Sequence, residues 1–260
     1  MAGRHNEKWT REETILAFDL YCKTPFSKIT KTNKDIIALA EVLGRTPSSV
    51  GLKMANLAHY DPELIARNIK GMSNASKLDK EIVEEFKGDW EELSYQAQVI
   101  LSKYKHTDIM TLNPELLTER IPEGTDIEKE TKVRVGQYFF RVSVLTAYGN
   151  SCCVTGMKKP DLLIASHIKP WKDSDSRTER TNPSNGLCLN ALHDKAFDRG
   201  LITLDKDYRI VISKRLSDMG MDEKTRDWFF SYNHQQIMLP DKFIPGRDFI
   251  EYHNDVVFQG

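Results

Sequence analysis

Residues 166–171 read Ser166-His167-Ile168-Lys169-Pro170-Trp171, and two further stretches belong with them. These are Asn185-Gly186-Leu187-Cys188-Leu189 and Leu192-His193-Asp194-Lys195-Ala196-Phe197-Asp198-Arg199-Gly200. The chain thus carries a histidine, an asparagine and a second histidine in a fixed order. The strand and helix signals around them predict the fold of this region.

The apolar run 162–166 predicts a short strand that gives way to a Lys-Pro turn at His167. A turn-rich cluster follows, and residues 187–189 then predict a second strand. Residues 191–199 predict a helix that Gly200 ends. The order strand, loop, strand, helix is a ββα unit.

His167 lies where a strand end holds it but leaves it facing solvent. Imidazole titrates near neutrality, so this side chain can take a proton from water and act as a general base toward a phosphodiester. The alternative is that His167 only packs or caps. The other motif residues, Asn185 and His193, favour the catalytic interpretation.

These residues resemble the HNH, or ββα-metal, endonuclease family, in a restriction-endonuclease-like subgroup. The resemblance covers roughly residues 150–205, and the preceding segment 133–141 is similar to what leads into that module. It implies a catalytic set of His167, Asn185 and His193. Asn185 would hold His167 in line with the scissile phosphate, and cleavage would leave a 5′-phosphate and a 3′-hydroxyl.

The resemblance also implies one divalent metal ion, with Mg²⁺ or Mn²⁺ expected and Zn²⁺ or Ni²⁺ as alternatives. His193 is the expected ligand, because an imidazole nitrogen suits a borderline divalent cation and a helix fixes its direction. Ser166 stands where many family members have a further ligand, so Asp198 and Asp194 are the candidates for the second one. Asp194 and Asp198 share a helix face, whereas His193 and Asp198 diverge by about 140°.

Basic side chains near the motif are expected to contact DNA. Arg199 can clamp a phosphate from the helix that carries His193, and Lys169 follows the base histidine in the first stretch. For Arg199 the alternative is a pair with Asp198 or a helix cap.

The four cysteines predict no structural zinc site. Cys152 and Cys153 are adjacent, and Cys188 and Cys22 are isolated, so no pair has the spacing of a zinc site. We expect Cys153 and Cys188 to be small buried apolar residues. Unpaired cysteines and the lack of a signal peptide favour a cytoplasmic protein.

Length and composition allow two modest domains and exclude several classes of protein. The chain has 260 residues, 40% of them hydrophobic, and no apolar run long enough to span a membrane. A Gly-rich phosphate loop is missing, which excludes a nucleotide cofactor of that type. The net charge of −1 hides two mildly basic ends, 1–70 and 131–260, around an acidic middle, 71–130.

Residues 1–70 predict a helical DNA-recognition domain. A capping box at Thr10 and Glu13 predicts a first helix, and 34–43 predicts a second that stops at Gly44. A third begins at Thr46 and Pro47, so the last two resemble a helix-turn-helix. The residues expected to meet DNA are Arg45, Ser48, Ser49, Lys53 and Asn56. The alternative is a small bundle for dimerisation or docking.

Residues 71–130 predict an acidic helical spacer, with helices near 78–86 and 91–104 and a proline-broken stretch to Gly124. Residues 131–260 predict the nuclease domain. Its first helix, 131–148, offers Arg134 and Arg141 to a DNA backbone, although surface solvation explains these charges equally well.

Beyond the motif, residues 201–204 and 208–212 predict a hairpin, and 227–232 predicts a helix. Trp228 and Phe229 of that helix are expected in the core. No role is assigned to His234 or His253.

The sequence therefore predicts an α+β protein that cuts double-stranded DNA. The expected role is that of a restriction enzyme in phage defence, and one form of this hypothesis is an enzyme that requires modified cytosine in its DNA substrate. A homodimer is expected, because one site must meet two strands. The alternatives are a nicking or DNA-processing nuclease and a non-catalytic DNA-binding regulator.

Overall fold

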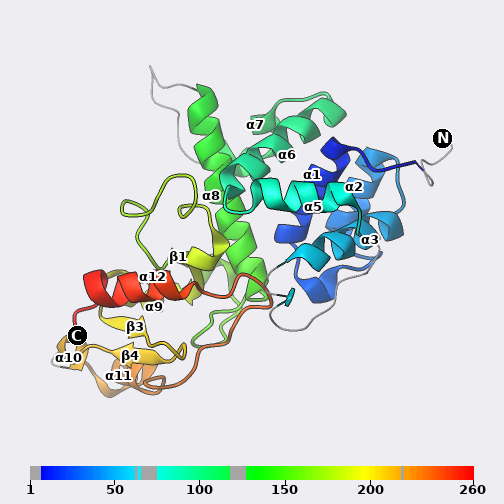
Figure 1. Cartoon of the computed structure of the whole chain (residues 1–260). Helices are drawn as coiled ribbons and strands as arrows, with labels where there is room; N and C mark the ends of the chain where they lie inside the picture. The colour runs from blue at the N-terminus through cyan, green and yellow to red at the C-terminus, as the bar shows by residue number, and fades with distance from the viewer. Residues whose placement is uncertain (1–6, 62–63, 66–74, 118–126, 218–219) are drawn as a thin grey trace. The chain divides into compact units, whose positions relative to one another are not determined.

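A computed structural model describes residues 7–61, 64–65, 75–117, 127–217 and 220–260. The chain divides into two compact units, residues 1–143 and 144–260 (Figure 1). The expected boundary at residues 70 and 71, and the proline-broken stretch near Gly124, lie outside the described residues. Mixed helices and two small antiparallel sheets make this an α+β protein.

The N-terminal unit is helical. Its elements are α1 (Arg11–Cys22), η1 (Phe26–Lys28), α2 (Lys34–Leu43), α3 (Pro47–Leu57), η2 (Ala58–Tyr60), α5 (Lys77–Phe86), α6 (Trp90–Lys105), α7 (Ile109–Leu112), η3 (Pro114–Leu117) and α8 (Ile127–Ala147), whose last residues enter the second unit. The helix starts follow the predicted caps: Thr10 and Glu13 form a capping box, and Thr46 accepts a hydrogen bond from the Ser49 amide.

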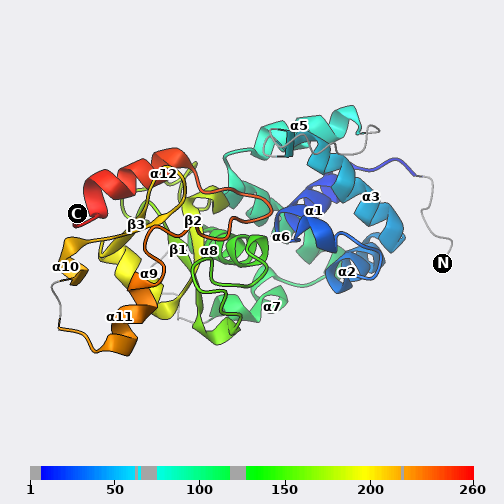
Figure 2. The same ribbon diagram turned by 90° about the horizontal axis from the view of Figure 1, so that it is seen from below.

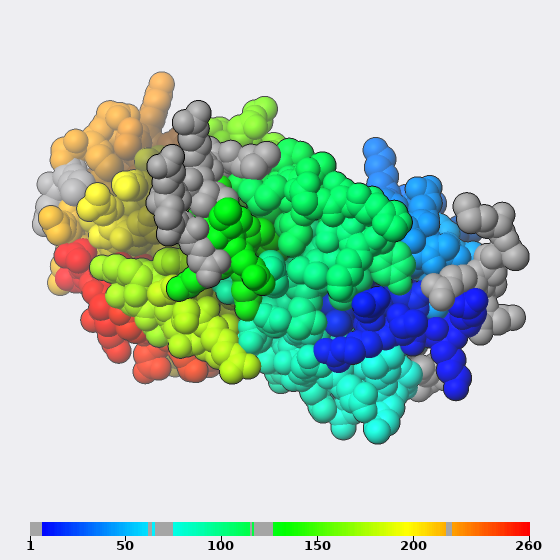
Figure 3. Space-filling model, turned by 90° about the horizontal axis from the view of Figure 1, so that it is seen from above, coloured from blue at the N-terminus to red at the C-terminus, as the bar shows by residue number. Residues whose placement is uncertain are grey.

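Helix α1 lies at the centre of this unit. It packs against α2, α3, α5 and α6, and its residues Ile15, Ala17 and Phe18 are almost fully buried. Figure 3 shows the dark-blue surface of the α1 region beside the cyan surface of the α5 region. Arg11 of α1 pairs with Glu85 of α5. The helices of the predicted spacer therefore belong to the same unit as the N-terminal helices, because they cover the same core.

Two buried ion pairs join these helices. Arg45 forms a two-pronged bond with Glu13, at 3.1 and 2.8 Å, and Lys53 pairs with Asp79. Both cations lie over the ring of Trp9, at 4.4 and 5.0 Å from its centroid. The four charged side chains are at most 4% exposed, so removal of one partner would leave the other charge buried without compensation.

The C-terminal unit contains both sheets. Its elements are η4 (Pro160–Leu162), β1 (Leu163–His167), η5 (Pro183–Asn185), β2 (Gly186–Asn190), α9 (Ala191–Asp198), β3 (Ile202–Leu204), β4 (Ile210–Ile212), α10 (Lys214–Ser217), α11 (Glu223–Phe230), α12 (Arg247–Tyr252) and the π-helix η6 (His253–Val257). Strands β1 and β2 are antiparallel, with His167 opposite Gly186, and α9 follows β2 directly. This is the predicted ββα arrangement, seen from below in Figure 2.

Helix α9 ends where the sequence predicts, because the backbone of Val257 closely approaches Gly200. Gly200 has a φ of 64°, and a Cβ there would lie 2.0 Å from the carbonyl oxygen of Val257. Only glycine fits, because the C-terminal segment crosses this turn. That segment is thereby held beside α9.

The four cysteines are buried, and none is in a disulfide within the described residues. Burial raises the pKa of Cys153 well above its usual value, with smaller contributions from Cys152 and Cys188. Among the described helices, none combines the length and apolarity that a membrane span requires.

Candidate active site

A cavity of about 870 Å³ opens between β1, α9 and the C-terminal segment. Six of its lining residues matter here: Ser166, His167, Asp194, Asp198, Arg199 and His253. Of the residues expected in the site, His167, Asp194, Asp198 and Arg199 line this cleft. His193, Asn185 and Lys169 do not line it.

His167 is half-buried at the end of β1, and its tautomer is fixed by the backbone. Its Nε2 lies 2.8 Å from the carbonyl oxygen of Arg180. A carbonyl oxygen can only accept, so Nε2 carries the proton and the basic lone pair of neutral imidazole is on Nδ1. Burial lowers the pKa of His167, and the bond to Arg180 partly opposes this. The ring is therefore neutral at pH 7, as a general base requires.

Asn185 is fully buried and fastens the loop that follows His167. Its Oδ1 accepts a hydrogen bond from the Lys169 amide at 2.8 Å, and its Nδ2 donates to the Lys169 carbonyl at 3.2 Å. Its own carbonyl accepts from the Ile168 amide at 2.9 Å. Asn185 thus acts on His167 through the backbone of Ile168 and Lys169, the two residues that follow the histidine.

Asp194 and Asp198 lie one helical turn apart on α9, and both line the cleft with His167. Burial raises the pKa of each carboxyl group, and the charge of Asp194 raises that of Asp198 further. The Ser166 hydroxyl lies close enough to lower the pKa of Asp194, although its geometry falls short of a regular hydrogen bond. A neighbouring cation would relieve this repulsion.

These two carboxylates fit a hard divalent cation such as Mg²⁺ or Mn²⁺. Within the described residues no three His, Cys, Asp or Glu side chains come together as a metal-binding group. Mg²⁺ is commonly held by one or two carboxylates, with water and substrate phosphate oxygens completing its shell. The donor set therefore suits a magnesium-like ion better than the closed site of a structural metal.

His193 faces away from the cleft, which argues against the expected ligand and catalytic roles. Its side chain is 1% exposed, its Nδ1 lies 3.0 Å from Nδ2 of the helix cap Asn190, and its ring packs among Trp228, Phe229 and Tyr232. Burial lowers its pKa to about 4, and the Trp228 carbonyl partly opposes this. Neighbours on a helix point about 100° apart, so Asp194 lines the cleft although His193 does not.

The basic residues expected to contact DNA differ in their exposure and in their ion pairs. In the C-terminal unit, Arg199 is exposed at the end of α9 and lines the cleft, and no ion pair joins it to Asp198 among the described side chains. Its charge nevertheless lowers the pKa of Asp198. Lys169 is paired with Glu179 at 2.6 Å.

In the N-terminal unit, the burial of Arg45 and Lys53 in ion pairs argues against DNA contact. Ser48 is exposed and Ser49 half-buried, but the exposed face of α3 also carries Leu52, 48% exposed, and Asn56 is half-buried. On α8, Arg134 pairs with Glu130 and donates to the Leu116 carbonyl at 2.8 Å. Arg141 is exposed there.

Two residues of the site, Arg180 and His253, had no sequence signal, whereas Trp171 belongs to the first quoted stretch. Arg180 supplies the carbonyl that orients His167, while its Nε donates to the carbonyls of Trp171 and Ser174, at 3.2 Å each. Its guanidinium lies over the Trp171 ring, which meets His167 edge-on. His253 is buried, stacks on Phe197 at 3.8 Å and lines the cleft.

One comparison with known proteins covers this region. Residues 152–205 match a family model described as HNH endonuclease. The match includes β1, β2 and α9, and so His167, Asp194 and Asp198. A search of curated proteins gives no match for the chain. The family match supports a nuclease, and hence a hydrolase that acts on nucleic acid, as the activity of the C-terminal unit.

Proposed function

We propose that the chain is a metal-dependent DNA endonuclease that hydrolyses phosphodiester bonds at the cleft of its C-terminal unit. The observation that carries the proposal is the meeting of a neutral, oriented His167 with Asp194 and Asp198 in one cavity. A general base beside a pair of carboxylates is what metal-assisted phosphodiester hydrolysis needs.

The roles follow from the geometry. His167 takes the proton of the attacking water on Nδ1, because Nε2 is committed to the Arg180 carbonyl. Arg199 binds a non-bridging phosphate oxygen through charge-assisted hydrogen bonds. Asp194 and Asp198 would hold the divalent ion. When bound, that ion supplies Lewis-acid stabilisation of the charge on the leaving 3′ oxygen.

We extend the proposal to a restriction enzyme that acts on foreign DNA, in the cytoplasm and in phage defence, with the N-terminal unit choosing the substrate. Exposed side chains of that unit, such as Ser48 and Arg141, are candidates for DNA contact. Double-strand cleavage favours a homodimer, because the described residues of one chain hold one such cleft and a duplex has two strands.

The test is cleavage of supercoiled plasmid containing unmodified, methylated or hydroxymethylated cytosine, in Mg²⁺ and in Mn²⁺. Wild type is compared with Asp194→Asn and Asp198→Asn, and with Asp207→Asn as an exposed control outside both cavities of the unit. The proposal expects linear product from wild type and the control alone. Nicked circles would indicate a nicking enzyme, and binding without any cutting would indicate a regulator.

A further inference from the structure

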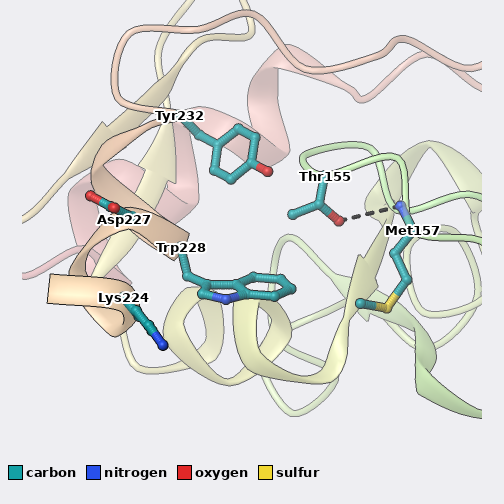
Figure 4. Close-up of a pocket in the computed structure, with 6 residues that line it drawn as sticks. All are labelled: Thr155, Met157, Lys224, Asp227, Trp228 and Tyr232. Atoms are coloured by element: carbon teal, nitrogen blue, oxygen red, sulfur yellow. Dashed lines mark hydrogen bonds between the residues drawn. The ribbon is translucent and has the colours of Figure 1, made fainter. Parts of the chain in front are cut away.

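A second cavity, of about 480 Å³, lies beside α11 in the C-terminal unit (Figure 4). Its six lining residues are Thr155, Met157, Lys224, Asp227, Trp228 and Tyr232. None of them lines the active-site cleft. We call this cavity the α11 pocket.

One aromatic residue of the α11 pocket, Trp228, is more exposed than packing of the helix requires. Phe229 anchors α11 in the core and is 5% exposed, whereas its neighbour Trp228 is 42% exposed. Figure 4 shows the rings of Trp228 and Tyr232 extending toward Thr155 and Met157. Behind them lies His193, whose ring is 6.3 Å from Trp228 and 5.8 Å from Tyr232. The pocket therefore offers flat aromatic surface with the buried ring of His193 behind it.

Polar groups surround this surface. Thr155 Oγ1 accepts from the Met157 amide and from Asn190 Nδ2, both at 3.3 Å, so its own proton is available to a ligand. The Tyr232 hydroxyl has no hydrogen-bond partner among the described residues. Lys224 and Asp227, both exposed, add one positive and one negative charge at the pocket. Stacking surface, hydroxyl groups and a cation together suit a nucleotide.

The pocket and the cleft lie on different faces of one helix. His193 contacts the pocket residues, and the next residue, Asp194, lines the cleft. A helix with its side chains is about 10–12 Å across, which is about three base-pair steps of DNA. A nucleotide a few steps from the cleavage site can therefore reach the α11 pocket if it leaves the helical stack.

We propose that the α11 pocket binds one nucleobase unstacked from the DNA strand near the cleavage site. The identity of the ligand as DNA rests on the proposed function, but the binding itself needs no cleavage. Trp228 supplies the stacking face, and Thr155 and Tyr232 supply hydroxyl groups to the base edge. An unpaired base is favoured, because it has no stacking or pairing to lose.

The test uses His167→Ala protein, so that no DNA is cut, and two fluorescein-labelled duplexes. One is fully paired, and the other has a single unpaired cytosine. Fluorescence anisotropy is expected to show about tenfold tighter binding of the second duplex. Trp228→Ala loses this preference, and Trp228→Phe keeps most of it. Leu239→Ala, which removes an apolar side chain of the same 42% exposure outside the pocket, leaves the preference unchanged.

Equal binding of the two duplexes, or no binding of either, overturns the proposal, as does a preference that survives in Trp228→Ala. Thermal unfolding of each variant confirms that it is folded. Plasmid cleavage by the wild type is measured separately. Cleavage without a Trp228-dependent preference contradicts nucleobase binding in the α11 pocket but supports the nuclease activity. A Trp228-dependent preference without cleavage supports nucleobase binding but contradicts the nuclease activity.

Discussion

His167 donates its Nε2 proton to the carbonyl oxygen of Arg180 across 2.8 Å. This bond selects the tautomer that leaves Nδ1 basic, and it depends on the loop that carries Arg180. The loop is held in turn by the Arg180 side chain, which bonds the carbonyls of Trp171 and Ser174. The orientation of the base is therefore a property of the whole loop.

Replacing Arg180 by methionine should lower kcat for DNA cleavage about tenfold with little change in KM, because the base loses its orientation while the DNA-binding surface stays in place. Single-turnover kinetics against pH measures this. Arg209→Met is the matched control, since Arg209 is exposed and lies outside the cleft. An equal loss in both variants would show that Arg180 has no special positioning role.

Asp194→Asn and Asp198→Asn should each weaken Mn²⁺ binding and lower cleavage by about a hundredfold or more. Loss of a side chain that only hydrogen-bonds to a metal ligand costs up to about a hundredfold, and loss of the ligand itself should cost no less. Calorimetric titration with Mn²⁺ measures affinity without any turnover. Unchanged Mn²⁺ affinity in both variants would place the metal elsewhere.

His193→Ala should leave Mn²⁺ affinity within about twofold of wild type and reduce the free energy of unfolding by about 2 kcal/mol, because it opens a cavity among Trp228, Phe229 and Tyr232. Urea unfolding and Mn²⁺ titration on the same protein separate the two effects. If stability is kept and the metal is lost, His193 is a ligand after all.

Lys53→Met should destabilise the N-terminal unit by about 3–5 kcal/mol, because it leaves the carboxylate of Asp79 buried without its cation. Adding Asp79→Asn should recover much of this loss, since asparagine keeps an acceptor for the Ser76 amide. Urea unfolding measures both variants. A folded Lys53→Met protein with normal stability and weakened DNA binding would instead favour a DNA-contacting lysine.

Acid should destabilise the fold through two buried histidines. Burial lowers the pKa of His193 and of His253 to about 4 in the folded chain, against 6.5 as the ordinary value. The unfolded chain then binds more protons below pH 6.5, so stability is fully present above pH 6.5 and is lost toward pH 4. Each histidine contributes about 3 kcal/mol to this loss by pH 4.

The measurement is urea unfolding between pH 7 and pH 4 for wild type and His253→Gln. The slope of stability against pH should be smaller in the variant, because one of the groups that take up a proton on unfolding is gone. His234→Gln, at an exposed position, is the control and should follow wild type.

Local chemistry made much of the fold predictable. The capping box at Thr10, the stop at Gly44 and the strands around His167 depend on neighbours in sequence, and each was found close to its predicted position. The same holds for the helix start at Thr46 and Pro47.

The prediction was less successful where a partner lies far along the chain. Arg45 and Lys53 were expected on the surface because they are charged, but their partners Glu13 and Asp79 are 32 and 26 residues away. A signal did exist for Lys53. It lies three residues after the buried Val50 and four before the buried Leu57, and so on the apolar stripe of its helix.

The choice between His193 and its neighbour shows a similar limit. The sequence indicated that Asp194 and Asp198 share a helix face, but the direction of that face depends on how α9 packs between β1 and α11 (Figure 2). Arg180 could not be found at all, because its role depends on a backbone carbonyl in an irregular loop.

The most direct test of the central claim is chemical rescue of the general base. His167→Gly protein is assayed for plasmid cleavage with Mg²⁺ at pH 7.5, with and without added imidazole. The account predicts that the variant loses about a hundredfold or more in rate and that imidazole restores part of it, because a diffusible base replaces the missing ring. Cleavage by His167→Gly at the wild-type rate would contradict the account.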